Sequence, residues 1–579
     1  MIRFRACSRK LRNPRLTRRS SRIFPPAAPP APPPGGPPGR WIWDRAELAR
    51  LPGMTLLEFI ELLPGVIRFR AGGFGRPEGI VALGAGGARV RVLLDGFELD
   101  PLGTGAFPLE TIALLDLNRV IVERSLSGIR VELESFRLET SEPFSTVEMG
   151  TGAAQTRVLR ALFSRGFTGG RSIGTGAFDL VTTGGIGVNE EYQHSNANLR
   201  WSHALGDDAG VQIEWRRTAV DRAGSVFPQQ TTRSDLLVTT RTRIREALVL
   251  EAILGRSASE EEAAEAIPGR FSSSQAAARA AYSTERLGLS GLARVRSSGD
   301  GSVPLPAGEL EGSVHFRPLP RLRIEADSRL ARSGDESAAE SRILASALLP
   351  GGISLFGSFA AGDRFVPSFE VDEAEAEEGV LRHLRGVPVR STSGGWRFGA
   401  EIAGLFGSLG AAAFQKPESP VLPFGLPFDF GSPGFEAPAL TGAEVYFRIP
   451  VPRTGGALRM EGWYSRAQDV AGRPYTPNEF GRVAVVFHDV FYDGQLEPSL
   501  RLEGIHRGSA LVASEPGGEF SAGTRPNQTL DLSINIRILS VQAFLLWENV
   551  LNTQTATDFP DAPPAFPRIV YGASWQFLN

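Results

Sequence analysis

The sequence contains almost no cysteine. Cys7 is the single cysteine among 579 residues, which excludes an internal disulfide and a zinc site built from several thiolate ligands. Histidine is also scarce, because the six histidines are scattered and show neither an H-E-x-x-H motif nor a paired spacing. Isolated histidines are more often structural than metal ligands. We therefore predict no metal site and no bound cofactor.

An excess of one charge and a long apolar run are absent as well. The formal net charge is -2, so a general nucleic-acid partner has no electrostatic support. The longest uncharged run, Ile343 to Gly362, is long enough to cross a membrane as a helix, but Pro350-Gly351-Gly352 interrupts it. We predict two strands joined by a tight turn there.

The N-terminal residues carry no recognisable secretion signal. Residues Met1 to Arg22 are rich in arginine, and the Pro/Ala/Gly tract from Pro25 to Pro38 follows them in place of an apolar segment. We expect residues 1–40 to be disordered. Two explanations remain open: the start codon misses the true export signal, or the protein is cytoplasmic or exported by another route. We expect the first.

A compact unit is predicted between Thr55 and Glu134. A short helix from Leu56 to Leu63 ends at Pro64-Gly65, a buried strand runs from Val90 to Leu94, and a second strand runs from Arg119 to Glu123. These elements predict a small mixed α/β domain over residues 41–140, with Trp41 to Pro52 packed loosely against it.

The remainder, residues 141–579, is rich in short alternating strands. Apolar and polar residues alternate in Val211–Arg216 (VQIEWR) and in Asp531–Ile538 (DLSINIRI), which is the pattern of a strand with two different faces. A sandwich would turn the apolar face inward and a membrane barrel would turn it toward lipid, and periodicity does not decide between them. We count roughly 22 candidate strands, near the number in barrels that enclose a plug.

Connection lengths favour the barrel, because outer-membrane barrels have short turns at one end and long loops at the other. Short connections are predicted at Pro350–Gly352 and at Leu539-Ser540. Long outer loops are predicted at Ser257–Ser274, Arg364–Thr392 and Gln415–Glu436.

Three motifs occur in order in the N-terminal unit: Leu63–Val66 (LPGV), Val92–Gly96 (VLLDG) and Leu117–Glu123 (LNRVIVE). Their order and spacing resemble the plug domain of TonB-dependent outer-membrane receptors. The resemblance implies a mainly β fold, in which a large antiparallel transmembrane barrel of about 22 strands holds a small α/β plug in its lumen. The plug-motif residues are Pro64, Gly65, Val66, Leu94, Asp95, Gly96, Arg119, Val120, Val122 and Glu123.

The resemblance also implies a location, a function and partners. A protein of this family lies in outer-membrane lipid of a Gram-negative bacterium and imports a scarce solute, such as a metal chelate or an oligomeric nutrient. It is not an enzyme and binds no nucleic acid. Its partners would be an extracellular small-molecule or oligomeric ligand, TonB with its inner-membrane energising complex, and the barrel assembly machinery.

The C-terminal strand carries the expected assembly signal. Tyr571, Trp575 and Phe577 share one face of the segment Arg568–Asn579, and aromatic residues favour the membrane interface. In the receptor family, a last strand that ends in an aromatic residue is read by the barrel assembly machinery. Two residues follow Phe577 here, so the signal is displaced.

The sequence also departs from the family pattern. The segment Arg124–Glu134 replaces the usual G-P-x-S-x-L-Y-G loop and the GGVINI strand, and no TonB box is recognisable before the plug. A plugged barrel without energy coupling, acting in surface binding or adhesion, therefore remains an alternative.

A third alternative is a soluble β-rich hydrolase. Gly170–Gly174 (GRSIG) fits the G-x-S-x-G nucleophile motif, with Ser172 as the nucleophile. That motif requires a strand before it and a helix after it, whereas this one lies between two alternating strands, so we interpret it as a hairpin. The acidic clusters Glu260–Glu265 and Asp372–Glu378 lack the spacing of a calcium loop, and we expect solvated outer loops.

Two features of the predicted plug suggest functional roles. Asp95-Gly96 ends a buried strand at a tight turn, where the glycine can adopt a positive φ. Arg119 and Glu123, together with Arg124, are expected to pair with charges on the barrel wall. A plug held by such polar contacts can be released one contact at a time, which suits a gate.

Overall fold

A computed structural model describes residues 39–578 except 51–53, 71, 84, 87–88, 103–106, 139–141, 168–170, 185–190, 223–228, 264–268, 300–304, 372–383, 422–434, 469–475, 513–521 and 554–565. The expectations for residues 1–38 and for Asp372–Glu378 lie outside this range. No helix among the described residues is both long enough and apolar enough to cross a membrane.

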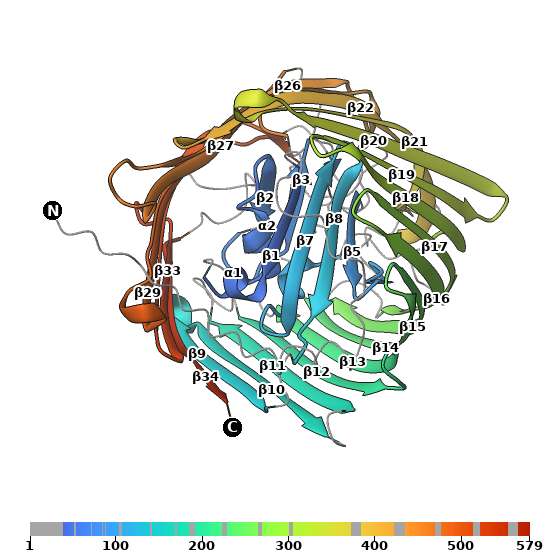
Figure 1. The fold of residues 1–579 in the computed structure, drawn as a ribbon, viewed down its shortest axis with the longest axis horizontal. Helices are drawn as coiled ribbons and strands as arrows, with labels where there is room; N and C mark the ends of the chain where they lie inside the picture. The colour runs from blue at the N-terminus through green and yellow to red at the C-terminus, as the bar shows by residue number, and fades with distance from the viewer. Residues whose placement is uncertain are drawn as a thin grey trace.

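The larger part of the chain forms a closed antiparallel barrel of 22 strands (Figure 1). The predicted fold is confirmed, and the count of candidate strands agrees with the structure. The strands in chain order are β9 (Phe144–Gly152), β10 (Arg157–Phe167), β11 (Ser172–Thr183), β12 (Tyr192–Ala204), β13 (Ala209–Arg222), β14 (Gln229–Arg245), β15 (Leu248–Ala263), β16 (Gly269–Ser283), β17 (Leu287–Ser298), β18 (Gly308–Leu319), β19 (Leu322–Ser333), β20 (Glu336–Leu348), β21 (Ile353–Val371), β22 (Leu384–Gly404), β23 (Gly407–Lys416), β26 (Leu440–Pro450), β27 (Leu458–Gln468), β28 (Glu479–His488), β29 (Leu496–Arg507), β32 (Asn527–Ile538), β33 (Val541–Glu548) and β34 (Arg568–Leu578).

The ring closes where the last strand pairs with the first. β34 runs antiparallel to β9, with Leu578 opposite Phe144 and Val570 opposite Gly152. Tight connections such as 246–247, 405–406 and 539–540 lie at one end of the barrel, which we call the short-turn end. Connections at the other end, the long-loop end, extend to 508–526 and 549–567, and two small hairpins, β24 (Ser419–Val421) with β25 (Phe435–Ala437) and β30 (Leu511–Val512) with β31 (Ala522–Gly523), lie in them.

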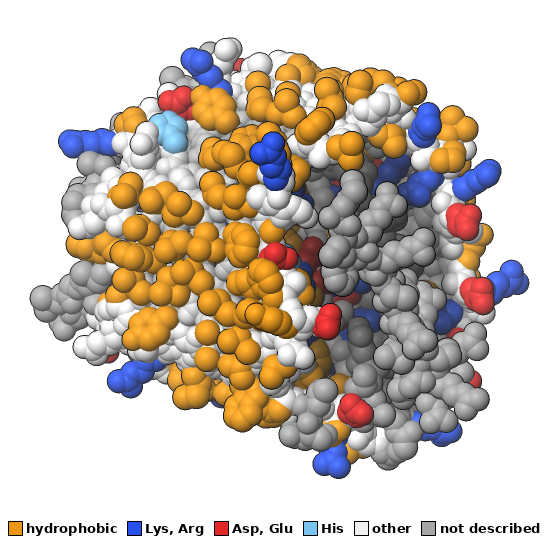
Figure 2. Space-filling model, turned by 60° about the vertical axis from the view of Figure 1, so that its left-hand side comes forward, with side chains coloured by type: hydrophobic (Ala, Val, Ile, Leu, Met, Phe, Trp, Pro, Cys, Tyr) orange, Lys and Arg blue, Asp and Glu red, His pale blue; other side chains and the backbone are white. Residues whose placement is uncertain are grey.

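The outer face of the barrel is apolar. On β13, Ile213 and Trp215 are 40% and 37% exposed, whereas the alternating residues Gln212, Glu214 and Arg216 are buried in the lumen. Apolar side chains cover a broad belt of the outer surface (Figure 2). This orientation decides between the two architectures that period-two alternation allows, because a sandwich would bury the apolar face.

The N-terminal residues form a plug within the ring (Figure 1). Its main sheet has the order β1-β7-β8-β5-β6, in which only β5 and β8 pair in parallel. A second sheet has the order β2-β3-β4. The elements are β1 (Arg40–Asp44), α1 (Arg45–Arg50), α2 (Leu56–Ile60), β2 (Val66–Arg70), β3 (Glu78–Ala82), β4 (Ala85–Gly86), β5 (Val90–Leu94), β6 (Phe97–Glu98), the 3-10 turn η3 (Leu109–Thr111), β7 (Leu117–Ser125) and β8 (Gly128–Ser135).

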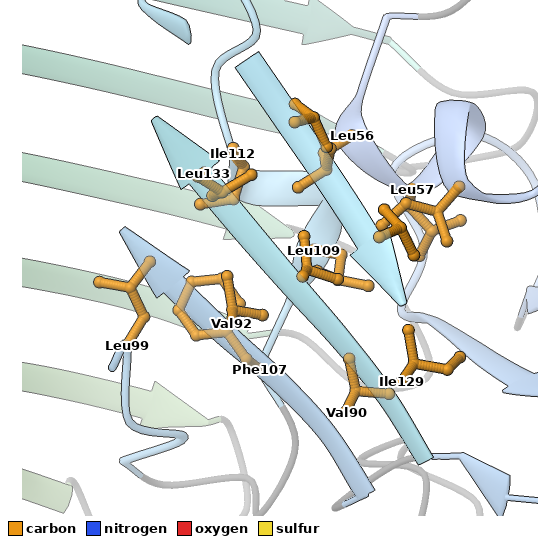
Figure 3. Packing of buried hydrophobic residues seen from close by; sticks show 14 of the residues in the cluster. Leu56, Leu57, Val90, Val92, Leu99, Phe107, Leu109, Ile112, Ile129 and Leu133 are labelled. Carbon is orange, nitrogen blue, oxygen red and sulfur yellow. The ribbon is translucent and has the colours of Figure 1, made fainter. Parts of the chain in front are cut away.

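The plug has its own hydrophobic core (Figure 3). Leu56 and Leu57 of α2 and Leu109 of η3 lie against strand residues such as Val92 and Leu133. Thr55 caps α2 by accepting a hydrogen bond from the Glu58 backbone N–H. Buried apolar side chains on both helix and sheet therefore hold the unit together, and Leu237 of β14 and Ile253 of β15 join the same cluster from the barrel wall.

Several sequence-based boundaries are wrong. The helix predicted to reach Leu63 ends at Ile60 and continues as turns to Pro64-Gly65. Trp41–Asp44 does not pack loosely, because it belongs to the edge strand β1, paired with β7. The predicted long loops at Ser257–Ser274 and Arg364–Thr392 are shorter, since β15, β16, β21 and β22 extend into them. The residues that favour loops, serine and glutamate, sit there in paired strands, and Glu260–Glu262 belongs to β15.

Candidate functional site

The interface between plug and barrel wall is the candidate functional site, and an ion pair between Arg124 and Glu444 lies at its centre. Arg124 is the penultimate residue of plug strand β7, and its Nη2 donates to Glu444 of β26 at 2.7 Å. Glu444 also accepts from Arg397 of β22 at 2.7 Å. All three side chains are buried. Removing one partner of such a buried pair leaves an uncompensated charge, so this contact fixes the plug firmly.

Glu123 and Arg119, which the sequence suggested as wall contacts, have different partners. Glu123 pairs with Arg342 of β20 at 2.5 Å. Burial alone would raise the pKa of Glu123, but the guanidinium of Arg342 and two further arginines lower it to about 2. Arg119 instead pairs within the plug, with Glu134 at 3.3 Å, and its side chain is 35% exposed. The prediction that Arg119 contacts the wall is wrong, because its guanidinium pairs with Glu134, which lies opposite it on the neighbouring plug strand β8.

The Asp95-Gly96 turn touches the wall directly. Both residues have positive φ, 47° and 89°, which is the backbone of a two-residue hairpin turn and joins β5 to β6. Asp95 accepts from the Ser135 backbone N–H at 3.2 Å and from Gln212 of β13 at 3.1 Å. Burial would raise the pKa of Asp95, yet nearby arginines, Arg137 first, lower it. The turn therefore presents a charged carboxylate to the lumen wall.

Carboxylates and guanidinium groups also interleave beside β6. Glu98, Glu309 and Glu311 have oxygens close enough together to hold a cation. Arg91 contacts Glu311 at 2.5 Å, and Arg294 contacts Glu98 at 2.6 Å. The guanidinium groups supply the positive charge that a metal ion would bring, so the geometry favours an ion-pair network over a metal site.

Glu110 forms a further contact at the 3-10 turn η3. It pairs with Arg222 of β13 at 3.0 Å. Burial raises the pKa of Glu110 to about 7, because Arg222 offsets only part of the desolvation and Glu78 opposes ionisation. This carboxyl group is therefore the plug contact whose charge changes near neutral pH.

The other plug-motif residues pack in the plug core or allow a turn of the backbone. Val66, Leu94, Val120 and Val122 are fully buried apolar residues of the plug core. Pro64 precedes Gly65, whose φ of 72° requires a residue that tolerates the left-handed region. The motif thus combines packing positions with the wall contacts of Asp95 and Glu123.

A large cavity lies between the plug and part of the barrel wall. Its volume is about 1330 Å³, and it is lined by plug residues of α1 and of the segment Leu114–Arg119 and by wall strands including β26 to β29 and β32 to β34. We call it the plug cavity. It reaches the short-turn end, because Ser408 and Leu539-Ser540, which lie in or beside tight turns, line it.

Ser172 does not occupy a nucleophile elbow. It is the first residue of strand β11, which follows strand β10. Its hydroxyl lies 2.8 Å from His203 Nδ1 on the neighbouring strand β12. A strand after the serine lacks the strand-to-helix turn that exposes a catalytic serine, and the pairing here is a cross-strand contact in a barrel wall.

The C-terminal aromatic residues lie at the closure of the ring. Tyr571 and Trp575 of β34 are 52% and 56% exposed, and the rings of Trp575 and Phe577 meet edge to face at 5.1 Å. These side chains therefore face outward beside the seam between β34 and β9.

The sequence analysis did not identify the arginines of the barrel wall as functional residues. Only Lys10 and Lys416 are lysines among the 62 basic residues, and the plug carboxylates pair with arginine throughout. Arginine at the polar position of an alternating strand is the signal that would have found them, because guanidinium binds carboxylate in a fixed fork. The main wall arginines are Arg216, Arg222, Arg294, Arg296, Arg342, Arg397, Arg482 and Arg568.

Comparisons with known proteins agree with this arrangement. Residues 38–132 match the TonB-dependent Receptor Plug Domain. The siderophore receptor PirA from Acinetobacter baumannii has a similar structure, with a TM-score of 0.71 at 10% identity over 93% of this chain and 98% of that one. A mutant of the ferric enterobactin receptor PfeA from Pseudomonas aeruginosa gives 0.70 at 12% identity over 93% and 98%. The copper transporter OprC gives 0.71 at 11% identity over 93% and 98%. No curated protein sequence matches the chain.

Proposed function

Because this chain joins a TonB-dependent receptor plug domain to a closed barrel, the architecture of TonB-dependent receptors, we propose that it imports a scarce solute across the outer membrane in an energy-coupled manner. The observation that carries the proposal is the set of buried ion pairs between plug and wall. Apolar contacts also join the two, since Phe69 of the plug lies in one cluster with Trp463 and Phe480 of the wall, but ion pairs such as Arg124–Glu444 and Glu123–Arg342 can be broken one at a time.

The apolar belt and the unequal connections at the two ends of the barrel support a membrane orientation. The apolar belt faces lipid, the short-turn end faces the periplasm and the long loops face the medium. Tyr571, Trp575 and Phe577 form the signal that the assembly machinery reads. Solute binds at the long loops and the outer surface of the plug, and TonB pulls on the chain before β1.

The solute is a metal chelate or an oligomeric nutrient. The similar solved structures include siderophore receptors and a copper transporter, which supports the first of these classes. The chain's own residues bind the solute and move, with no covalent step.

Uptake measured with and without TonB tests the proposal. A strain that depends on this protein for a labelled ferric chelate should lose uptake when TonB is deleted, while surface binding of the chelate at 4 °C should persist. Uptake that survives TonB deletion would replace energised import with passive passage. Binding without uptake in both strains would favour the surface-binding alternative.

A further inference from the structure

The outer surface of the barrel changes from apolar to basic on three neighbouring strands, β13, β14 and β15 (Figure 1). On β13 the outward position after Trp215 is Arg217, and on β15 the outward position after Leu254 is Arg256. Trp215 and Leu254 are 37% and 56% exposed, and both arginines are exposed as well. Both strands begin at the short-turn end, so the arginines lie on the long-loop side of the apolar residues.

The two arginines lie close together on this surface. Cross-strand pairing places Arg217 opposite Ser234 of β14, and Ser234 opposite Ala258 of β15. Arg256 precedes Ala258 by two residues and therefore points to the same side of the wall. With neighbouring strands about 4.8 Å apart and a rise of about 3.4 Å per residue, the Cα atoms of the two arginines are about 12 Å apart. Their long side chains can therefore contact one headgroup between them.

Neither guanidinium group has a partner within the protein. Among the residues that the structure describes, the side chains of Arg217 and Arg256 form no ion pair and donate no hydrogen bond. The outward carboxylate of Glu260, four residues beyond Arg256, pairs with Arg270 at 3.3 Å instead. Two positive charges consequently remain for a ligand at the edge of the apolar belt.

Other exposed arginines near the long-loop end do have neighbours that occupy them. Arg332 of β19 donates from Nε to the carbonyl of Gly334 at 3.1 Å. Arg466 of β27 lies directly opposite Glu479 of β28. These two arginines therefore provide a comparison for the pair on β13 and β15.

The order of side chains fits a lipid with an anionic headgroup. Trp215, Leu236 and Leu254 form an exposed apolar surface on the membrane side of the arginines, against which acyl chains can lie. Guanidinium groups bind phosphate through two parallel N–H···O bonds, which makes phosphate the headgroup that suits them best. A soluble anion would contact the arginines alone, whereas a lipid contacts both parts of the surface.

We propose that Arg217 and Arg256 form a binding site for one phosphate-bearing lipid of the outer leaflet, with its acyl chains against Trp215, Leu236 and Leu254. The site lies on the outer wall, apart from the plug and the lumen. It therefore goes beyond import, and of the proposed function it uses only the membrane orientation. A lipid held there fixes the depth of β13 to β15 in the outer leaflet.

Native mass spectrometry of the full-length protein in detergent tests the site by counting bound lipid molecules. The probe is a synthetic acylated disaccharide that carries two phosphate groups, and the comparison is the same lipid without phosphates. The parent should bind the first copy of the phosphorylated probe at least about tenfold more tightly than the comparison lipid. Arg217→Gln/Arg256→Gln should weaken this first step about thirtyfold, which is about 2 kcal/mol for two arginines at a charged lipid surface.

A matched control removes the same charge from other parts of the wall. Arg332→Gln/Arg466→Gln should weaken the first step by less than about threefold. Equal losses in the two double variants would overturn the proposal, because they would show a general attraction to net charge rather than a site. Heat-modifiable migration of each variant confirms that its barrel is closed.

Competition separates a lipid from its headgroup alone. Inorganic phosphate in about tenfold excess should leave the first lipid copy bound, and Leu236→Ser/Leu254→Ser should weaken lipid binding severalfold. Displacement by inorganic phosphate, or equal binding of the phosphate-free lipid, would overturn the proposal. A parent that binds no copy of the probe would overturn it too, and an acidic protein partner would then fit the arginines better. Purified protein needs no TonB for this measurement, so failure of the site and failure of energised import are distinguishable.

Discussion

The guanidinium of Arg124 lies where a side chain at position 65 would project. A Cβ built on Gly65 would come within 1.7 Å of Arg124 Nη1 and 3.3 Å of Glu444 Oε2. Gly65, in the first plug motif, therefore leaves the space that Arg124, directly after the third motif, occupies. The motif spacing reflects this packing, and the wall carboxylate completes it.

Replacing Gly65 with alanine should loosen the plug. The left-handed φ costs about 1–2 kcal/mol for a residue with a Cβ, and displacing the Arg124 side chain adds a cost on the order of 1–3 kcal/mol. Hydrogen exchange of β7 peptides should rise, and cells should become sensitive to vancomycin. Gly73→Ala is the control, because nothing lies within 4 Å of a Cβ there. Equal effects of both variants would contradict the contact.

Arg124 and Arg119, which lie near opposite ends of β7, should contribute differently to the stability of the plug. Glu444→Gln leaves Arg124 and Arg397 buried without a full counter-charge, and we expect a loss of about 3–5 kcal/mol in plug stability. Glu134→Gln removes the partner of the partly exposed Arg119 and should cost about 0–1 kcal/mol. Urea titrations followed by hydrogen exchange of β7 would measure both. A larger effect from Glu134→Gln would show that the wall pair does not hold the plug.

Glu110 should make plug docking depend on pH. Its pKa is about 7 in the folded protein, above the value of about 4.3 in an unfolded chain, so the folded state binds the extra proton. The contribution to stability is therefore greatest below the unfolded pKa and declines as the pH rises through 7. Between pH 5.5 and 8 the change is on the order of 2 kcal/mol. The melting temperature of the parent should fall more than that of Glu110→Gln over this range. Parallel pH profiles of the two proteins would rule out this role.

The outward aromatic residues of the last strand should govern assembly. Trp575→Ala and Phe577→Ala should each lower the folded, heat-modifiable fraction in outer membranes severalfold, because they sit beside the closing seam. Trp215→Ala removes another outward tryptophan, at 37% exposure in the middle of the ring, and should change the folded fraction little. Similar losses from all three would point to lipid anchoring rather than to an assembly signal.

Much of the fold was predictable because two local rules decide it. Alternating residues such as Ile213 and Glu214 predict a strand with unlike faces, and the plug motifs in front of the strands predict a filled barrel. Turn signals were equally informative: Pro350–Gly352 and Leu539-Ser540 join neighbouring strands as expected. Each rule depends only on residues near one another in sequence.

The site was less predictable because it depends on distant residues. Nothing near Arg124 in the sequence indicates Glu444, and nothing near Arg119 shows that Glu134 would hold it instead of the wall. Strand ends failed for a related reason. Polar residues such as Glu260 suggest a loop locally, yet cross-strand pairing in β15 and β16 keeps them extended.

The seam between β34 and β9 has a consequence for biogenesis. Thr146 and Ser574 meet across it although 428 positions separate them in the chain. A ribosome must therefore finish almost the whole polypeptide before the ring can close, and any prematurely released product keeps two bare strand edges. Closure of the barrel therefore depends on the last strand of the chain, and a fragment that lacks β34 leaves the edges of β9 and β33 unpaired.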